Sequence, residues 1–191
     1  MVASVRKMSQ EEWIAGAFDA LRDGGIDALR VEPLAKRLGV TKGSFYWHFD
    51  NRRALHIAML GRWEQLSTSA IIDQVDGQPA TPAEQLRTLI HQTAAPNPVS
   101  DGIETSIRAW ATTDDVVAQA TQRVDDRRVD YAARLLRAAG LPKAVASRRS
   151  RLLYRMLIGE YTWRTSGGPT ITKRELDDVV DLMLGPVESR S

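Results

Sequence analysis

The stretch LAKRLGVTKGSFYWHF, residues 34–49, decides the fold of this chain. Leu34 and Leu38 recur at a helical interval and share one face of a helix. Gly39 follows at a point where a residue with positive φ would end that helix, and Thr41 is placed to cap the next one. A helix, a tight turn and a second helix in this order predict a helix-turn-helix.

The second of these helices is unusually rich in aromatic residues. Positions 45–49 hold four of them, in a chain with only five Trp, four Tyr and three Phe. Phe45 and Phe49 lie four residues apart, so both can point inward against the first helix. Exposed aromatics are unusual on an ordinary soluble helix and are expected on a helix that enters a DNA major groove. The outer face would hold Lys42, Gly43, Ser44, Tyr46, Trp47 and His48.

Motif positions on both sides of this stretch complete a larger pattern. They are Gly25-Ile26 at the end of a first helix, the run from Val31 to Thr41, the segment Gly43-Ser44-Phe45-Tyr46-Trp47-His48-Phe49, and Arg52 and Leu55 in a fourth helix. Over residues 9–62 the pattern closely resembles the N-terminal domain of tetracycline-repressor (TetR)-type transcriptional regulators. The resemblance implies an all-α protein with an N-terminal three-helix helix-turn-helix DNA-binding domain.

The resemblance also implies which side chains bind DNA. Tyr46 and His48 are expected at phosphates, and Lys42, Ser44 and Trp47 are candidates for contacts with base edges. The full set of expected DNA-binding residues is Arg30, Thr41, Lys42, Gly43, Ser44, Tyr46, Trp47, His48 and Arg52. The alternative interpretation is a helical hairpin that carries surface aromatics by chance.

Two positions depart from the family pattern. Arg30 stands where the second helix usually opens with Ser or Thr, so it can reach a phosphate but cannot cap the helix in the same way. Arg52 stands where the family usually has Lys, a conservative change for a phosphate contact. The phosphate contacts at the second helix would therefore differ from those of the family pattern.

Basic charge is concentrated in the same region. The chain of 191 residues has a net charge of only +2. Between Arg30 and Arg53, however, it has six basic and two acidic residues. A locally basic patch on a nearly neutral protein favours phosphate binding at one end of the molecule.

Composition argues against several other classes of protein. The chain has no cysteine, which excludes disulfides, a thiolate metal site and a thiol nucleophile. Its three histidines form no metal-binding pattern, and no phosphate loop or nucleophile elbow is present. Residues 1–10 lack the apolar core of a signal peptide, and no apolar run is long enough for a membrane span. We expect a cytoplasmic protein that is not an enzyme and has no cofactor and no metal.

Beyond the motif, helix signals follow one another and strand signals are absent. Together with the motif, they predict about nine helices. Helix starts are expected at Ser9, Asp50, Thr81, Ser100, Thr113-Asp114-Asp115, residue 143 and Thr172. The predicted organisation is a DNA-binding domain over residues 1–60 and a helical effector-binding and dimerisation domain over residues 61–191. The helix that begins near Asp50 would connect them. The resemblance implies that residues 143–165 and 172–184 pair with a second copy as a four-helix bundle.

The larger domain of such regulators usually encloses a cavity for a small molecule. Large residues on its central helices are candidates to line it: His91, Trp110, Tyr131, Tyr154, Met156 and Trp163. The alternative is that most of them are ordinary core residues. Arg108 and Glu160 could orient a ligand, although such charges more often pair with each other or face water.

The resemblance implies a homodimeric repressor that binds a palindromic double-stranded operator and is released by a small-molecule effector. Activation of transcription is the alternative mode of action. A second interpretation is a helical architectural or protein-interaction protein that binds DNA without an effector. The sequence names neither the effector nor the operator.

Overall fold

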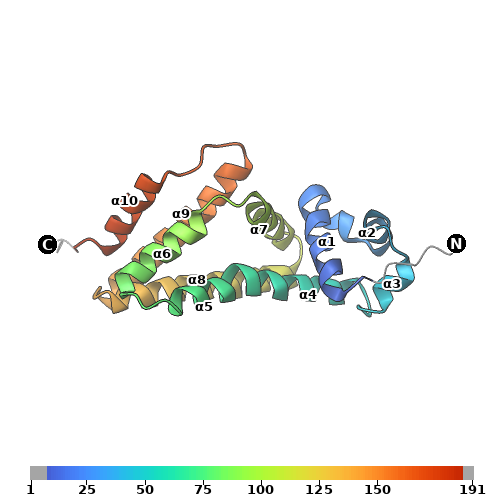
Figure 1. Cartoon of the computed structure of the whole chain (residues 1–191), viewed down its shortest axis with the longest axis horizontal. Coiled ribbons are helices and arrows are strands. Elements are labelled where there is room, and N and C mark those ends of the chain that lie inside the picture. The colour runs from blue at the N-terminus through green and yellow to red at the C-terminus, as the bar shows by residue number, and fades with distance from the viewer. Residues whose placement is uncertain (1–7, 187–191) are drawn as a thin grey trace.

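The computed structural model describes residues 8–186, and within them the chain forms helices and no strand (Figure 1). Residues 1–7 and 187–191, the outer ends of the two predicted domains, lie outside this range. The α-helices are α1 (Gln10–Gly24), α2 (Val31–Leu38), α3 (Lys42–Tyr46), α4 (Arg52–Glu64), α5 (Ala70–Asp76), α6 (Pro82–Ala94), α7 (Pro98–Ala111), α8 (Asp115–Ala138), α9 (Lys143–Thr165) and α10 (Lys173–Leu184).

Helices α4 and α5 are two parts of one rod. A π-helical turn, Gln65–Ser69, joins them without a break, so the helix runs from Arg52 to Asp76. Among the described residues this leaves nine separate α-helices, which confirms the predicted all-α fold and helix number. Figure 1 shows the rod running from the N-terminal helices along the rest of the molecule. We call α4, the π turn and α5 together the connecting rod.

Helix caps explain most of the boundaries. Ser9, Thr81 and Thr172 each accept a hydrogen bond from the backbone N–H three residues later, as predicted. Asp50 and Ser100 are wrong as starting residues. The caps are Asn51 and Asn97, because their side-chain oxygens accept from the backbone N–H of Ala54 and Ser100, at 3.0 and 3.1 Å.

The first hydrophobic core fixes the position of the helix-turn-helix. Phe45 of α3 is fully buried, and its ring meets Trp13 of α1 edge to face with the centroids 5.4 Å apart. Phe49 is buried beside it, as its spacing from Phe45 predicted. The position of α3 is therefore fixed by two aromatic side chains that point into the core.

This core does not stop at the end of the N-terminal helices. Ile107 and Trp110 of α7 and Val117 of α8 belong to the same cluster as Trp13 and Phe45. Helix α1 packs directly on α7, so more than the connecting rod joins the N-terminal helices to the rest of the chain. The boundary near residue 60 stays a prediction.

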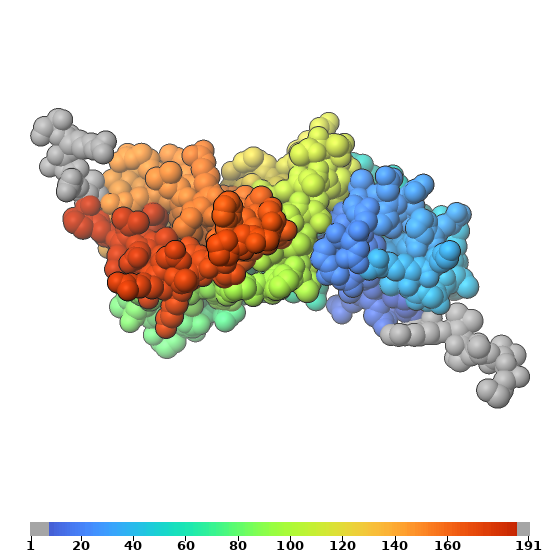
Figure 2. All heavy atoms as spheres, turned by 90° about the horizontal axis from the view of Figure 1, so that it is seen from above, coloured from blue at the N-terminus to red at the C-terminus, as the bar shows by residue number. Residues whose placement is uncertain are grey.

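A second core occupies the opposite end of the molecule. It is built from α5, α6, α8, α9 and α10, around Leu86, Leu135 and Leu153. The space-filling view shows the N-terminal helices at one end and α9 and α10 at the other (Figure 2). Helix α8 contributes to both cores and so spans the distance between them.

His56 of α4 provides a test of the contact between the rod and α7. Its ring packs edge to face on Trp110, 4.6 Å between centroids, and its Nε2 is buried without a hydrogen-bond partner among the described residues. Burial lowers the pKa of His56 to about 4, and the charge of Arg52 contributes in the same direction, whereas Asp114 opposes it.

Protonation of His56 should therefore lower the free energy of unfolding. The unfolded chain takes up the proton near pH 6.5 and the folded chain only near pH 4. The contribution of His56 to stability is therefore fully present above pH 6.5 and is lost as the pH falls towards 4. We expect a loss of roughly 2–3 kcal/mol over this range. Urea denaturation of the His56→Phe variant should show a pH dependence weaker by that amount. An unchanged dependence would contradict the burial of a neutral His56.

Candidate functional site

Helix α3 is short, and the turn that precedes it determines where it begins. Gly39 ends α2 in the left-handed region, with φ of 67°, and the chain then turns back towards α1. Thr41 caps α3, since its hydroxyl accepts from the Ser44 N–H at 3.3 Å. Both features agree with the pattern in the sequence. They present the residues of the first turn of α3 at the surface.

The outer face of α3, defined by Lys42, Gly43, Tyr46 and Trp47, is exposed. Tyr46 is 52% exposed and Trp47 is 84% exposed. Leaving a Trp side chain this exposed gives up the stabilisation of about 1.5–3 kcal/mol that burial of a large apolar side chain provides. Nothing in the packing of the described residues requires this exposure, so the face is suited to binding.

Charged partners on α2 approach this face. Lys42 Nζ lies 2.7 Å from Glu32 Oε1, and both side chains are solvent-exposed. The hydrogen bond between them, followed by their charge attraction, raises the pKa of Lys42 and lowers that of Glu32. Arg30 stands at the N-cap of α2 without a side-chain capping bond, and its Nε donates to the Asp27 carbonyl.

Two other expected DNA-binding residues lie at different depths. His48 is half-buried, and its Nε2 lies 2.7 Å from the carbonyl oxygen of Met8, just before α1. Because a carbonyl oxygen only accepts, Nε2 carries the hydrogen of this contact, and the neutral ring has no second N–H to donate to a phosphate. Arg52 is exposed in the first turn of α4. The DNA-binding roles of all the residues named from the sequence stay predictions.

A partly enclosed cavity lies between the connecting rod, α6, α8 and α9. The centre of a water-sized sphere can move through about 50 Å³ inside it. Because about 10–15 Å³ of such space accommodates one water molecule, the cavity has room for several non-hydrogen atoms. Its walls are mainly apolar, and they include Ile71, Ile72, Leu89, Ala132, Leu153 and Leu157.

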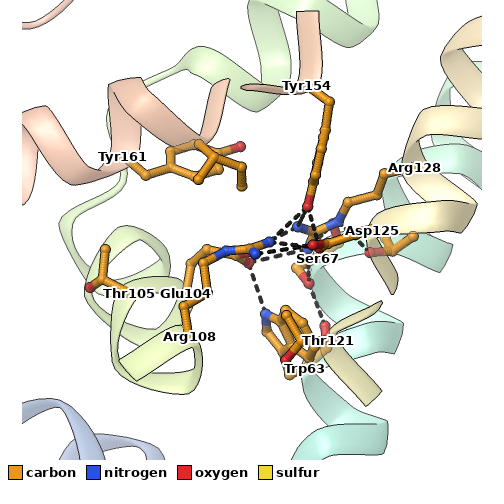
Figure 3. Close-up of polar contacts among 12 residues, drawn as sticks. Trp63, Ser67, Glu104, Thr105, Arg108, Thr121, Asp125, Arg128, Tyr154 and Tyr161 are labelled. Carbon is orange, nitrogen blue, oxygen red and sulfur yellow. Dashed lines mark hydrogen bonds and ion pairs between the residues drawn. The ribbon is translucent and has the colours of Figure 1, made fainter. Parts of the chain in front are cut away.

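Arg128 of α8 lines the cavity and is the centre of a polar cluster (Figure 3). Its two terminal nitrogens donate to both carboxylate oxygens of Glu104, at 3.0 and 3.2 Å. Its Nε donates to Thr68 Oγ1 at 2.8 Å, and Nη2 also donates to Ser67 Oγ at 2.8 Å. A further bond from Nη1 reaches the Tyr154 hydroxyl. All the N–H groups of this guanidinium are therefore directed at partners within the protein.

A second arginine extends the cluster. Arg108 of α7 binds Glu104 and Asp125, and its Nη2 donates to the Tyr154 hydroxyl at 2.7 Å. Tyr154 in turn donates to Asp125 at 2.5 Å. Trp63 Nε1 donates to Glu104 at 2.9 Å, so the cluster also contacts α4, just N-terminal to the π turn of the connecting rod. We call these residues, with Ser67 and Thr68, the arginine cluster.

The electrostatics of this cluster are balanced. Burial alone would raise the pKa of Glu104, but the charges of Arg128 and Arg108 and their hydrogen bonds lower it. Burial raises the pKa of Tyr154, so its hydroxyl keeps its proton and can donate to Asp125. The arginine cluster contains two guanidinium groups and two carboxylates, those of Glu104 and Asp125, so it has no net charge.

Of the predicted effector-binding residues, only Tyr131 and Tyr154 line this cavity. His91 faces α10 and contacts Asp177 at 3.0 Å. Trp110 packs in the first core, and Met156 lies against the second. Trp163 is 59% exposed. Effector binding by the six residues stays a prediction, and the cavity accounts for two of them.

Sequence reasoning missed Arg128 and Glu104 as a buried pair. Both break an apolar face: Arg128 lies four residues after the buried Val124, and Glu104 lies three before the buried Ile107. A charged residue at such a position was the available signal. Arg108 was noticed, and it binds carboxylates of the cluster. Glu160 binds Arg164 at 3.0 Å and is absent from the cavity lining.

No group of three or more His, Cys, Asp or Glu side chains between residues 8 and 186 is placed to hold a metal ion. Over the same residues, none of the helices combines the length and the apolar character that crossing a membrane requires.

The N-terminal helices match a known family. Residues 14–59 fit the family model described as bacterial regulatory proteins, tetR family. Tetracycline repressor protein class A of Escherichia coli is 45% identical to the chain over 49 residues. That match covers 26% of this chain and 23% of the repressor, so the chain matches about a quarter of the length of this relative. The TetR resemblance of this region, identified from the motif, is confirmed.

Solved structures match over nearly the whole chain. A transcriptional regulator from Rhodococcus sp. Rha1 superposes with a TM-score of 0.73 at 20% identity, covering 93% of this chain and 95% of that one. The fatty acid degradation regulator of Bacillus halodurans superposes with a TM-score of 0.69 at 17% identity, covering 94% of this chain and all (100%) of that one. At these identities the likeness concerns the fold.

Proposed function

We propose that this chain, whose N-terminal domain is of the TetR family, is a DNA-binding transcription regulator. It would bind a palindromic operator as a homodimer and release it when a small molecule enters the larger domain. The observation that carries the proposal is the outer face of α3, where Tyr46 and Trp47 are exposed to solvent. On the inner face, Phe45 is buried against Trp13 and anchors the helix to the core. Repression is the expected mode of action.

The chemistry of α3 suits a major groove. Lys42, Gly43 and Ser44 form its first turn, the part of a recognition helix that contacts base edges. Gly43 would have no close neighbour even with a side chain, so α3 can approach a base or phosphate closely there. Lys42 would exchange Glu32 for a DNA group, and Tyr46 would donate to a phosphate.

A second copy of the chain would supply the other recognition helix. Helices α9 and α10 carry large apolar side chains that the single chain leaves exposed: Leu152 at 57%, Trp163 at 59% and Leu182 at 68%. Large apolar side chains that are left exposed on the last two helices favour a protein interface. A two-fold axis through these helices would present two copies of α3, as a palindromic operator requires.

The larger domain would sense the effector. Part of the cavity wall comes from the connecting rod, through Ser67, Thr68, Ile71 and Ile72. The rod begins at Arg52, shortly after α3 ends at Tyr46. A molecule that binds there can change the preferred position of the rod only through different affinities for two conformations. The direction of the response, release or recruitment of DNA, follows from which conformation the molecule prefers.

Substitution of Tyr46 tests DNA binding. Because Tyr46 is half exposed while Phe45 is buried, Tyr46→Ala should weaken operator binding about tenfold with an unchanged melting temperature. Fluorescence anisotropy with an operator selected from random DNA measures the first property, and thermal denaturation measures the second. Leu66→Ala is a matched control, since Leu66 is also 52% exposed but lies on the π turn. A lowered melting temperature with unchanged DNA affinity would refute the role of Tyr46.

Substitution of Leu182 tests the homodimer. Leu182→Glu places a charge in the proposed interface of α9 and α10, where burying it without a partner is costly. We expect native mass spectrometry to report a dimer for the unmodified chain and a monomer for this variant at the same concentration. Leu66→Glu adds the same charge at an exposed site on the π turn and should stay dimeric. Dimers of equal stability for all three proteins would contradict this interface.

A further inference from the structure

We propose that the cavity beside Arg128 binds a small uncharged aromatic or apolar molecule and rejects carboxylates, although an arginine lies in its wall. This inference rests on the proposed function, because it names the chemical class of the effector. An arginine in the wall of a cavity would by itself favour a negatively charged ligand, and the proposal is the opposite.

The first argument is that the polar groups in the cavity wall already have partners. Tyr161 donates to the Thr93 carbonyl at 2.9 Å, and Tyr131 donates to Asp76 at 2.8 Å. The hydroxyls of Thr93 and Ser150 donate to carbonyls of their own helices. With Arg128 bound to Glu104, Ser67, Thr68 and Tyr154, every polar side chain in the wall has a hydrogen-bond partner within the protein. A polar ligand would gain few new bonds for the water that it loses.

The second argument concerns an anionic ligand. Arg128 could bind a carboxylate only by giving up Glu104, which is 5% exposed. Glu104 would then lose the bidentate partner of a buried charge, and a second carboxylate would stand close to it. Breaking a buried ion pair by taking one partner away is strongly unfavourable. The arginine cluster therefore shields the positive charge of Arg128 from ligands.

A cationic ligand meets the complementary difficulty. The carboxylates bound to the lining residues Arg128 and Tyr154, those of Glu104 and Asp125, each bind an arginine already. Asp76, the partner of Tyr131, is also paired with Arg134 at 2.8 Å. A cation would lose its hydration without a carboxylate to replace it, and it would approach Arg128.

An uncharged ring fits what remains. Leu153 and Leu157 of α9 and Ile71 of the connecting rod offer apolar contacts, and Tyr154 and Tyr161 offer aromatic ones. The small volume favours a single ring over a long chain. The ligand would touch the rod directly at Ile71, next to the π turn that Arg128 holds.

The test compares three molecules built on one ring: toluene, benzoate and benzylammonium. Isothermal titration calorimetry of the full chain should show binding of toluene, with benzoate and benzylammonium at least about tenfold weaker. Ala132→Leu fills the cavity from α8 and should abolish toluene binding. Ala138→Leu makes the same change at an exposed position of α8 and should leave toluene binding intact. Benzoate binding equal to or tighter than that of toluene would overturn the proposal, as would toluene binding that survives Ala132→Leu.

A gain of function provides an independent check. Glu104→Gln removes the negative charge that occupies Arg128 and should raise the affinity for benzoate at least about tenfold. A folded Glu104→Gln protein without this gain would overturn the shielding argument; if the variant does not fold, the selectivity of the unmodified chain decides. Operator binding by the unmodified chain is measured without ligand. An unmodified chain that binds the operator but not toluene overturns this inference alone. An unmodified chain that binds no operator overturns the proposed function.

Discussion

The ion pair between Arg128 and Glu104 is the interaction on which the arrangement of the larger domain depends. Each of these charges loses hydration on folding. Their bidentate contact offsets that cost, together with the contact of Glu104 with Arg108 and the hydrogen bonds from Trp63 and to Ser67, Thr68 and Tyr154. The pair joins α7, α8 and the connecting rod at one point, and Tyr154 adds α9. These helices can shift relative to one another only if the pair breaks or moves as a unit.

The same arginine also contacts the π turn of the connecting rod. Ser67 and Thr68, which receive the hydrogen bonds of Arg128, lie within Gln65–Ser69, where the helical repeat of the rod is interrupted. Single π turns in α-helices often occur at functional sites. Because the first core extends from α3 into α7 and α8, a displacement at the π turn would act on helices that already contact the N-terminal domain. A small change at the cavity has a packed route to α3.

The sequence was sufficient where structure is determined locally. The cap at Thr41, the left-handed Gly39 and the inward pair Phe45 and Phe49 all follow from short-range spacing, and all were predicted. The cavity could not be predicted in the same way, because its walls depend on which faces of distant helices meet. Size and position suggested His91, but the meeting of α6 with α10 directs it to Asp177. The pairing of Arg128 with Glu104 likewise joins residues 24 positions apart on different helices.

The most direct measurement is the coupling between the cavity and α3. Operator affinity would be determined by anisotropy with and without saturating toluene, and toluene affinity by calorimetry with and without operator. Two sites linked through one conformational equilibrium must change each other's affinity by the same factor. The account predicts weaker operator binding with toluene, an equal reciprocal factor, and the loss of both effects in Ala132→Leu. Toluene that binds the cavity and leaves the operator affinity unchanged would contradict it.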